Sequence, residues 1–259
     1  MARSTLIVTL ALPFLLAACS VGGVSPLDDA AGTERVSIGF GTASSTSLAR
    51  ASIAVDGGDT LVLSGTNGTL ELTTVAFIVD ELELDCDDDS DRACAEFEEG
   101  PFFVDLPLGA GRVDVTSRAI PAGSYDELEF EIEDLDLDDD DSDSERARAA
   151  ALLEDIRLVY PDFPADASMV VEGRFTPLGG DARPFVVFIE ADVEVELDLE
   201  PPLVVGADGS ADRELLVDVR PDMWFVRADG SVRDLSLYVG SLLELDVEIE
   251  DGFVDVEFD

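Results

Sequence analysis

The chain has 259 residues, of which 46% are hydrophobic, and its formal net charge is −44. That hydrophobic share is too high for a disordered acidic chain, so a packed core is expected beneath a strongly charged surface. A surface of this sign repels nucleic acid and anionic lipid headgroups, which excludes both as expected partners. It attracts Ca²⁺, Mg²⁺ and basic proteins, although the simpler interpretation is charge that serves solubility.

The first nineteen residues resemble a bacterial lipoprotein signal. Arg3 precedes an apolar run over residues 6–16, which is too short to span a bilayer as a mature helix. A Leu-Ala-Ala step stands directly before Cys19, which is similar to the lipobox that lipoprotein signal peptidase cleaves ahead of the lipidated cysteine. This pattern predicts a signal peptide over residues 1–18, then a lipidated cysteine and a flexible tether over residues 19–35.

The same signal predicts a protein of the cell envelope that is held at a membrane by its N-terminal lipid. Ser20 follows the cysteine, at the position where enteric bacteria place an aspartate to retain lipoproteins at the inner membrane, so the outer membrane is favoured. Residues 36–259 then remain for one exported domain.

The cysteine count agrees with export. Once Cys19 carries lipid, Cys86 and Cys94 remain, and this even pair predicts one disulfide in an oxidising compartment. Two reduced thiols are the alternative. A zinc site is not expected here, because the chain has no histidine or further cysteine to complete one.

After the tether, alternation of apolar and polar residues predicts mostly β-strands. Turn signals at residues 56–59 and 67–68 indicate two hairpins, and the second turn leads into a long strand that reaches Val79. Beyond Val79 the apolar residues switch from odd to even positions, which predicts a β-bulge near Asp80 and Glu81. Further strands are expected over residues 102–106, 112–116, 127–133, 193–200, 213–219 and 223–227.

One helix is expected from Ser144, whose side chain can cap it, to about Asp155. The segment 193–200 alternates apolar and acidic residues, so one of its faces belongs to the core and the other to water, and the prolines at 201–202 are expected to end it. With one helix among many strands, the chain is predicted to be all-β. We expect an antiparallel Greek-key β-sandwich over residues 36–259 with one short helix insertion.

The C-terminal segment predicts a hairpin over residues 242–259, because Asp251 and Gly252 form a two-residue turn signal. In that register Ile249 faces Val254, and one face of the hairpin is apolar. The other face sets carboxylates directly opposite one another, which costs tenths of a kcal/mol for each pair. Dissolved salt or bound divalent cations would relieve that repulsion.

The residue inventory argues against an enzyme. The chain contains no histidine and no lysine, which excludes Ser-His-Asp, Cys-His, Ser-Lys and Schiff-base chemistry. Paired carboxylates can act as in a glycosidase, but 59 acidic residues will place some pair at the required distance by chance.

Two acidic loops are similar in spacing to a calcium-binding loop, in which carboxylates alternate along the chain to wrap a hard cation. Both loops lack the glycine expected at the sixth position and follow strands instead of helices, so solvated loop tips are the alternative interpretation. No cofactor is expected apart from calcium at these two loops. The candidate ligands are Asp85, Asp87, Asp89, Asp91 and Glu96 in one loop and Asp134, Asp136, Asp138, Ser142 and Glu145 in the other.

Trp224 is the single tryptophan of the chain and stands beside Phe225. Such a residue either stacks on a sugar or belongs to the core. As a binding residue it would indicate an envelope glycan or protein as the partner.

A family resemblance rests on the order of several segments along the chain. These segments are residues 70–75, 79–84, 104–108, 120–128, 217–225 and 229–232. Together they resemble a family of bacterial lipoproteins defined only as a domain of unknown function, the DUF4382 type, over roughly residues 48–235. The resemblance implies a β-sandwich of the transthyretin or carbohydrate-binding type and no established activity, so no functional residue is carried over. The acidic insertions at residues 85–91 and 134–143 depart from the simpler turns of that family.

Overall fold

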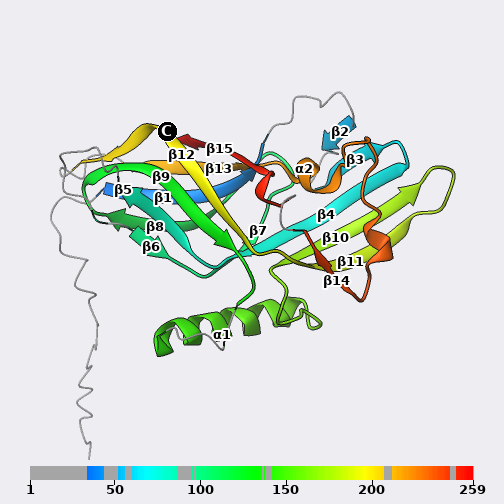
Figure 1. Cartoon of the computed structure of the whole chain (residues 1–259), viewed down its shortest axis with the longest axis horizontal. Helices are drawn as coiled ribbons and strands as arrows, with labels where there is room; N and C mark the ends of the chain where they lie inside the picture. The colour runs from blue at the N-terminus through cyan, green and yellow to red at the C-terminus, as the bar shows by residue number, and fades with distance from the viewer. Residues whose placement is uncertain are drawn as a thin grey trace, which may run out of the picture. The chain divides into compact units, whose positions relative to one another are not determined.

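The computed structural model describes residues 34–43, 52–55, 60–86, 95, 97–135, 137, 142–206, 212–245 and 249–258. All of them belong to one unit of the chain, residues 31–259. Strands make up most of this unit and confirm the all-β class (Figure 1). The predicted signal peptide and Cys19 lie outside the described residues. No helix within the described part is long and apolar enough to cross a membrane.

The described strands form three sheets, in which β1 pairs with β13 and β11 pairs with β14 in parallel and every other pair is antiparallel. Sheet A contains, in spatial order, β15 (Phe253–Phe258), β13 (Arg213–Val219), β1 (Glu34–Thr42) and β8 (Arg112–Ile120). Sheet B contains β14 (Leu242–Glu244), β11 (Arg183–Glu190), β10 (Met169–Pro177), β4 (Gly68–Val79), β3 (Leu61–Gly65) and β2 (Ser52–Val55), with β7 (Phe102–Asp105) also paired to β4. Sheet C contains β12 (Val193–Val205), β9 (Gly123–Ile132), β5 (Leu82–Cys86) and β6 (Phe97–Glu99).

All three sheets contribute to one apolar core. Phe40 from sheet A, Phe77 from sheet B and Phe130 from sheet C are buried together, with Phe253 and Trp224 beside them. The rings meet edge to face, with centroids 5.6 Å apart for Phe40 and Phe77 and 5.0 Å apart for Phe130 and Phe253. This arrangement is the one that aromatic quadrupoles favour, and it ties the sheets to each other.

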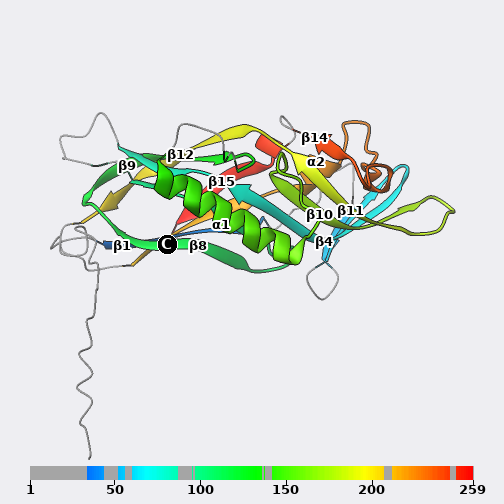
Figure 2. The ribbon, with the colours of Figure 1, turned by 90° about the horizontal axis from the view of Figure 1, so that it is seen from below.

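The helix α1 (Asp143–Val159) covers the outer side of β4 (Figure 2). Because β4 faces the main core on one side and α1 on the other, its residues from Val75 to Val79 are buried without interruption. Leu153 and Ile156 of the helix pack in the same cluster as Ala76 and Ile78 of the strand. Two more helices whose bounds the structure describes are short: α2 (Pro221–Phe225) and the 3-10 helix η1 (Leu235–Leu237).

Several element boundaries differ from the sequence-based expectation. The strand β1 begins at Glu34, so it includes the last two residues expected for the tether. The change of apolar phase after Val79 marks a change of sheet instead of a bulge, because β4 belongs to sheet B and β5 to sheet C. Ser142, not Ser144, caps α1, and the helix runs to Val159. A bulge and a sheet change produce the same switch of apolar phase, which is why the sequence pattern could not separate them.

Two further expectations about strand ends were wrong. The strand β12 continues through Pro201 and Pro202, with a register shift against β9 between Asp198 and Leu203. Proline is tolerated there because β12 is an edge strand, whose outer N–H groups have no neighbouring strand to bond. Residues 223–227 are mostly helical instead of extended, since α2 begins at Pro221, a residue whose fixed φ suits the first turn of a helix.

The C-terminal hairpin over residues 242–259 is not formed. The strand β14 pairs in parallel with β11 of sheet B, whereas β15 pairs with β13 of sheet A, where Val256 faces Val217. The turn at Gly252 exists, and a side chain there would collide with the indole of Trp224. A turn signal predicts that the chain reverses direction, but the partner of each strand depends on which sheet edge is free.

Candidate functional site

The outward side of sheet C carries carboxylates at nearly every position, and we call it the acidic face. It follows from the alternation of each strand: Leu84, Leu128 and Phe130 point into the core, and the residues between them point to water. The acidic face consists of Glu81, Glu83, Asp85, Glu98, Glu127, Glu129, Glu131, Glu194, Glu196 and Asp198.

The strand register sets these carboxylates directly opposite one another. Glu129, on the central strand β9, has Glu83 of β5 on one side and Glu196 of β12 on the other. Side chains at such positions have Cβ atoms about 5 Å apart, and like charges there destabilise a sheet. The rows are Glu98, Glu83, Glu129 and Glu196; Asp85, Glu127 and Asp198; and Glu131 with Glu194.

No arginine that the structure describes forms an ion pair with the acidic face. Nine ion pairs are formed among the described residues, and none of them includes a carboxylate of this face. The nearest exceptions, Glu99 with Arg118 and Glu145 with Arg148, lie at its margin. Uncompensated repulsion is therefore a property of this surface.

The repulsion and partial burial raise the pKa values of the central carboxyls. Burial, then a hydrogen bond to Glu83 and the charges of Glu98 and Glu83, raise the pKa of Glu81 to about 8. Burial, then the hydrogen bond and charge of Glu194, raise the pKa of Glu129 to about 7. The pKa values of Glu127 and Glu131 are also raised, first by burial and then by neighbouring carboxylates. Near neutral pH the acidic face therefore takes up protons that isolated carboxyls would release.

Three groups on the acidic face bring carboxylate oxygens close enough to share one cation. Within each group the oxygens lie within 4.8 Å of one another, and most of the residues are half-buried. Oxygen ligands of this kind suit hard cations such as calcium, whereas softer metals prefer imidazole or thiolate. The groups are Glu81, Glu83 and Glu98; Asp85, Glu127 and Glu129; and Glu129, Glu194 and Glu196.

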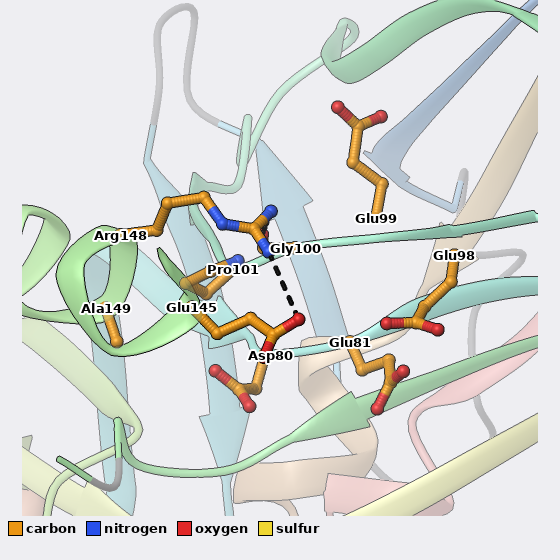
Figure 3. Close-up of a pocket in the computed structure, with 9 residues that line it drawn as sticks. All are labelled: Asp80, Glu81, Glu98, Glu99, Gly100, Pro101, Glu145, Arg148 and Ala149. Carbon is orange, nitrogen blue, oxygen red and sulfur yellow. Dashed lines mark hydrogen bonds and ion pairs between the residues drawn. The ribbon is translucent and has the colours of Figure 1, made fainter. Parts of the chain in front are cut away.

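A cavity of about 230 Å³ opens at one end of the acidic face, between β5, β6 and the first turns of α1 (Figure 3). Figure 3 shows Glu81 and Glu98 on the strand side and Glu145 and Arg148 on the helix side. The Arg148 guanidinium donates to the Gly100 carbonyl at 2.8 Å and forms an ion pair with Glu145 at 3.7 Å. Arg148, the cation among the described residues that line this cavity, therefore lies on the helix side, away from Glu81 and Glu98.

The structure brings only part of the predicted calcium loops into this site. Asp85 belongs to the acidic face and shares a cation-sized group with Glu127 and Glu129. Ser142 and Glu145 have another role: Ser142 accepts a hydrogen bond from the Glu145 N–H, and the Glu145 carboxylate accepts one from the Ser142 N–H at 2.9 Å. This capping box begins α1. Asp134 is described but belongs to none of the three groups. Asp87, Asp89, Asp91, Glu96, Asp136 and Asp138 lie outside the described residues.

The carboxylates of β5 and β9 were missed as a site by sequence reasoning. Their signal is the same acidic alternation that stands out in residues 193–200, but it is spread over three segments far apart in the chain. Cys86 ends β5 and is half-buried, while Cys94 lies outside the described residues, so their disulfide stays a prediction.

Trp224 is not a binding residue. Its side chain is 1% exposed, and its Nε1–H donates to the Ile249 carbonyl at 2.9 Å. The indole packs against Phe77, Phe225 and Phe253. The core interpretation is therefore correct, and the argument for a sugar-stacking platform loses its main support.

No family model, no curated protein and no solved structure matches this chain. The resemblance to the DUF4382-type lipoproteins accordingly stays a prediction, and function has to be inferred from the acidic face.

Proposed function

We propose that this chain is a lipid-anchored, non-catalytic protein of the bacterial cell envelope whose acidic face binds calcium and is stabilised by it. The observation that carries the proposal is the set of carboxylate rows on sheet C, with oxygens within 4.8 Å in three groups and no described arginine paired with them. A bound divalent cation replaces mutual repulsion with attraction, so it stabilises the folded state more than the unfolded one.

Calcium fits this surface better than other ions of the same charge. It accepts six to eight oxygen ligands in variable geometry, whereas magnesium demands a near-ideal octahedron. Within the described residues, the carboxylates of the acidic face come from strands and not from a loop that wraps the ion. We therefore expect weak binding, on the order of millimolar, as in other extracellular calcium modules.

Binding without catalysis is supported by the residue types of the chain. The chain contains no histidine and no lysine to act as nucleophile partner or Schiff-base residue. A raised pKa at Glu81 is accounted for by burial and its acidic neighbours.

Attachment to the envelope is supported by the lipoprotein signal that ends at Cys19. Mass spectrometry of the native protein tests it: we expect a mature chain that begins at an acylated Cys19 and, without reduction, a disulfide between Cys86 and Cys94. An intact, unacylated N-terminus would overturn the placement, and free thiols at both cysteines would overturn the disulfide.

Calorimetric titration of the full chain with Ca²⁺ tests the calcium proposal. Glu129→Gln removes the charge that two of the three groups share, so we expect it to weaken binding several-fold. Glu154→Gln is the matched control, because Glu154 is an exposed carboxylate on α1, outside the acidic face. Equal heats for both variants and the parent chain, or no saturable heat at millimolar Ca²⁺, would contradict calcium binding at this face.

A further inference from the structure

Sheets A and C each end in an edge that no other described strand covers, and the two edges lie side by side. Among the described residues β12 pairs only with β9, and β15 pairs only with β13. The two edge strands run in the same direction next to one another (Figure 1). We call the space between residues 193–205 and residues 250–257 the seam. An edge of this kind presents unpaired N–H and C=O groups to any extended chain.

At the other margin of the same two sheets, β8 of sheet A is bonded to β6 of sheet C, and in this respect the seam differs from it. There Thr116 of β8 donates a hydrogen bond to Glu99 of β6 at 2.5 Å, and Arg118 of β8 forms an ion pair with the same carboxylate at 2.5 Å. No hydrogen bond or ion pair links β12 to β15 within the described part of the chain. Among the described residues, sheets A and C are thus bonded to each other between β8 and β6, but not between β12 and β15.

Two hollows lie along the seam, with volumes of about 620 and 450 Å³. In the larger one Leu197 and Phe253 provide an apolar floor, and the side chain of Val254 is 44% exposed. The walls are acidic: Glu194 and Glu196 come from β12, and Glu250 and Asp251 come from the turn before β15. The smaller hollow adds Glu200, Asp255 and Glu257, and its single cation, Arg112, is already paired with Glu214.

We propose that the seam binds an extended, basic segment of a partner protein by strand addition. The segment lies antiparallel to β12 and bonds to its outer edge, because main-chain pairing supplies affinity in this mode of recognition. Its apolar side chains cover Leu197 and Val254, and its arginine or lysine side chains lie over Glu194 and Glu196. A second copy of this chain does not fit, since it would bring carboxylates against carboxylates. This role goes beyond calcium binding: it uses the strand edge and shares Glu194 and Glu196 with the acidic face.

Fluorescence anisotropy with the full chain and a labelled eight-residue peptide of alternating arginine and valine tests the proposal. A second peptide has the same sequence but carries N-methyl groups on alternate backbone nitrogens, which keeps the charge and blocks strand pairing. Both are measured in EDTA, so that the outcome does not depend on calcium. We expect the unmodified peptide to bind at least tenfold more tightly than the methylated one.

Val254→Arg adds a cation and bulk to the seam, and we expect it to weaken binding of the unmodified peptide at least tenfold. Val186→Arg on β11 is the control, because Val186 is 42% exposed and the change in net charge is identical. Circular dichroism confirms that both variants are folded. Equal affinity for the two peptides, or equal losses in the two variants, shows nonspecific charge attraction and overturns the proposal. A dimer of the parent chain in sedimentation, abolished by Val254→Arg, would also overturn it, because a second copy would then occupy the seam.

Discussion

Sheet B and sheet C differ in the charges of residues that lie directly opposite each other on neighbouring strands. On sheet B, Arg174 of β10 lies directly opposite Glu71 of β4, and its Nε donates to the carboxylate at 2.7 Å. On sheet C, Glu129 of β9 lies directly opposite Glu83 and Glu196. Cross-strand neighbours of opposite charge stabilise a sheet, and neighbours of like charge destabilise it. The chain thus places a complementary pair on one sheet and repelling rows on another.

Sheet A combines the two patterns, because Asp218 of β13 lies directly opposite Asp255 of β15 while other carboxylates of this sheet are paired with arginine. The Arg112 guanidinium of β8 bonds to both carboxylate oxygens of Glu214 on β13, and Arg220 holds Asp222 in the same two-pronged way. The fifteen arginines of the chain are few, yet none of those described is placed on the acidic face. A high negative charge alone does not account for that distribution, and the difference between the sheets supports the proposal that this surface binds cations.

The largest expected effect comes from a substitution in the core that the three sheets share. It tests whether the difference between sheets B and C is confined to the surface. Trp224→Ala removes an indole that packs with Phe77 and Phe253 and should lower the free energy of unfolding by about 3–5 kcal/mol. Urea unfolding at pH 5.5 and at pH 8.5 should give the same loss, because the indole is buried among aromatic side chains of the core while the carboxylates of the acidic face point to water. A loss that depends strongly on pH would show that core and face are coupled.

The second prediction is that stability falls as pH rises from 5.5 to 8.5. Glu81 and Glu129 have folded-state pKa values of about 8 and 7, above the ordinary 4.5, so the folded state binds more protons than the unfolded one. Repulsion is absent below about pH 4.5 and develops as these groups ionise, which lowers stability through pH 7 and 8. The carboxyls of Glu145 and Glu214, whose pKa values are lowered, stay ionised throughout this window.

Differential scanning calorimetry measures this effect directly. We expect the melting temperature at pH 8.5 to lie on the order of 5 °C below that at pH 5.5, at constant ionic strength and without divalent cations. A melting temperature that rises from pH 5.5 to pH 8.5 would contradict the claim that repulsion between the carboxylates of sheet C lowers stability.

Glu129→Gln is expected to stabilise the chain at pH 8.5, which is unusual for a substitution in a sheet. It removes the central charge of the longest row, and a gain of about 1 kcal/mol is expected from the relieved neighbours. Chemical unfolding at pH 8.5 checks the gain, with Glu154→Gln as the control that should change little. Destabilisation by Glu129→Gln would mean that its carboxylate makes an interaction worth more than the repulsion.

Arg174→Glu converts the pair on sheet B into a copy of sheet C and is expected to have the smallest effect. The pair is at the surface, so the melting temperature should fall by about 2 °C or less. Exchanging the charges in Arg174→Glu with Glu71→Arg should restore it. If the exchange does not restore the melting temperature, packing of the arginine stem and not charge determines this position.

Much of the sheet structure was predictable from local patterns. The strand β13 occupies the residues expected for it, and the expected hairpin of β3 and β4 forms, although its turn is Thr66 and Asn67, one residue before the expected pair. The pairing of sheet C was not predictable, since β5, β9 and β12 come from distant segments. Opposed carboxylates were expected in a C-terminal hairpin, but the longest rows of them occur between these three strands, and Asp255 of the C-terminal strand faces Asp218 of β13. The alternation of residues 193–200 predicted an acidic outer side but not its acidic neighbours.

Calcium-dependent melting at two pH values tests the central claim most directly. At pH 8.5, where the carboxyls of Glu81 and Glu129 are ionised, millimolar CaCl₂ should raise the melting temperature of the full chain well above NaCl of matched ionic strength. At pH 5.5 the difference between the two salts should nearly vanish, because protons occupy the same groups. Equal effects of the two salts at pH 8.5 would contradict calcium binding by the acidic face.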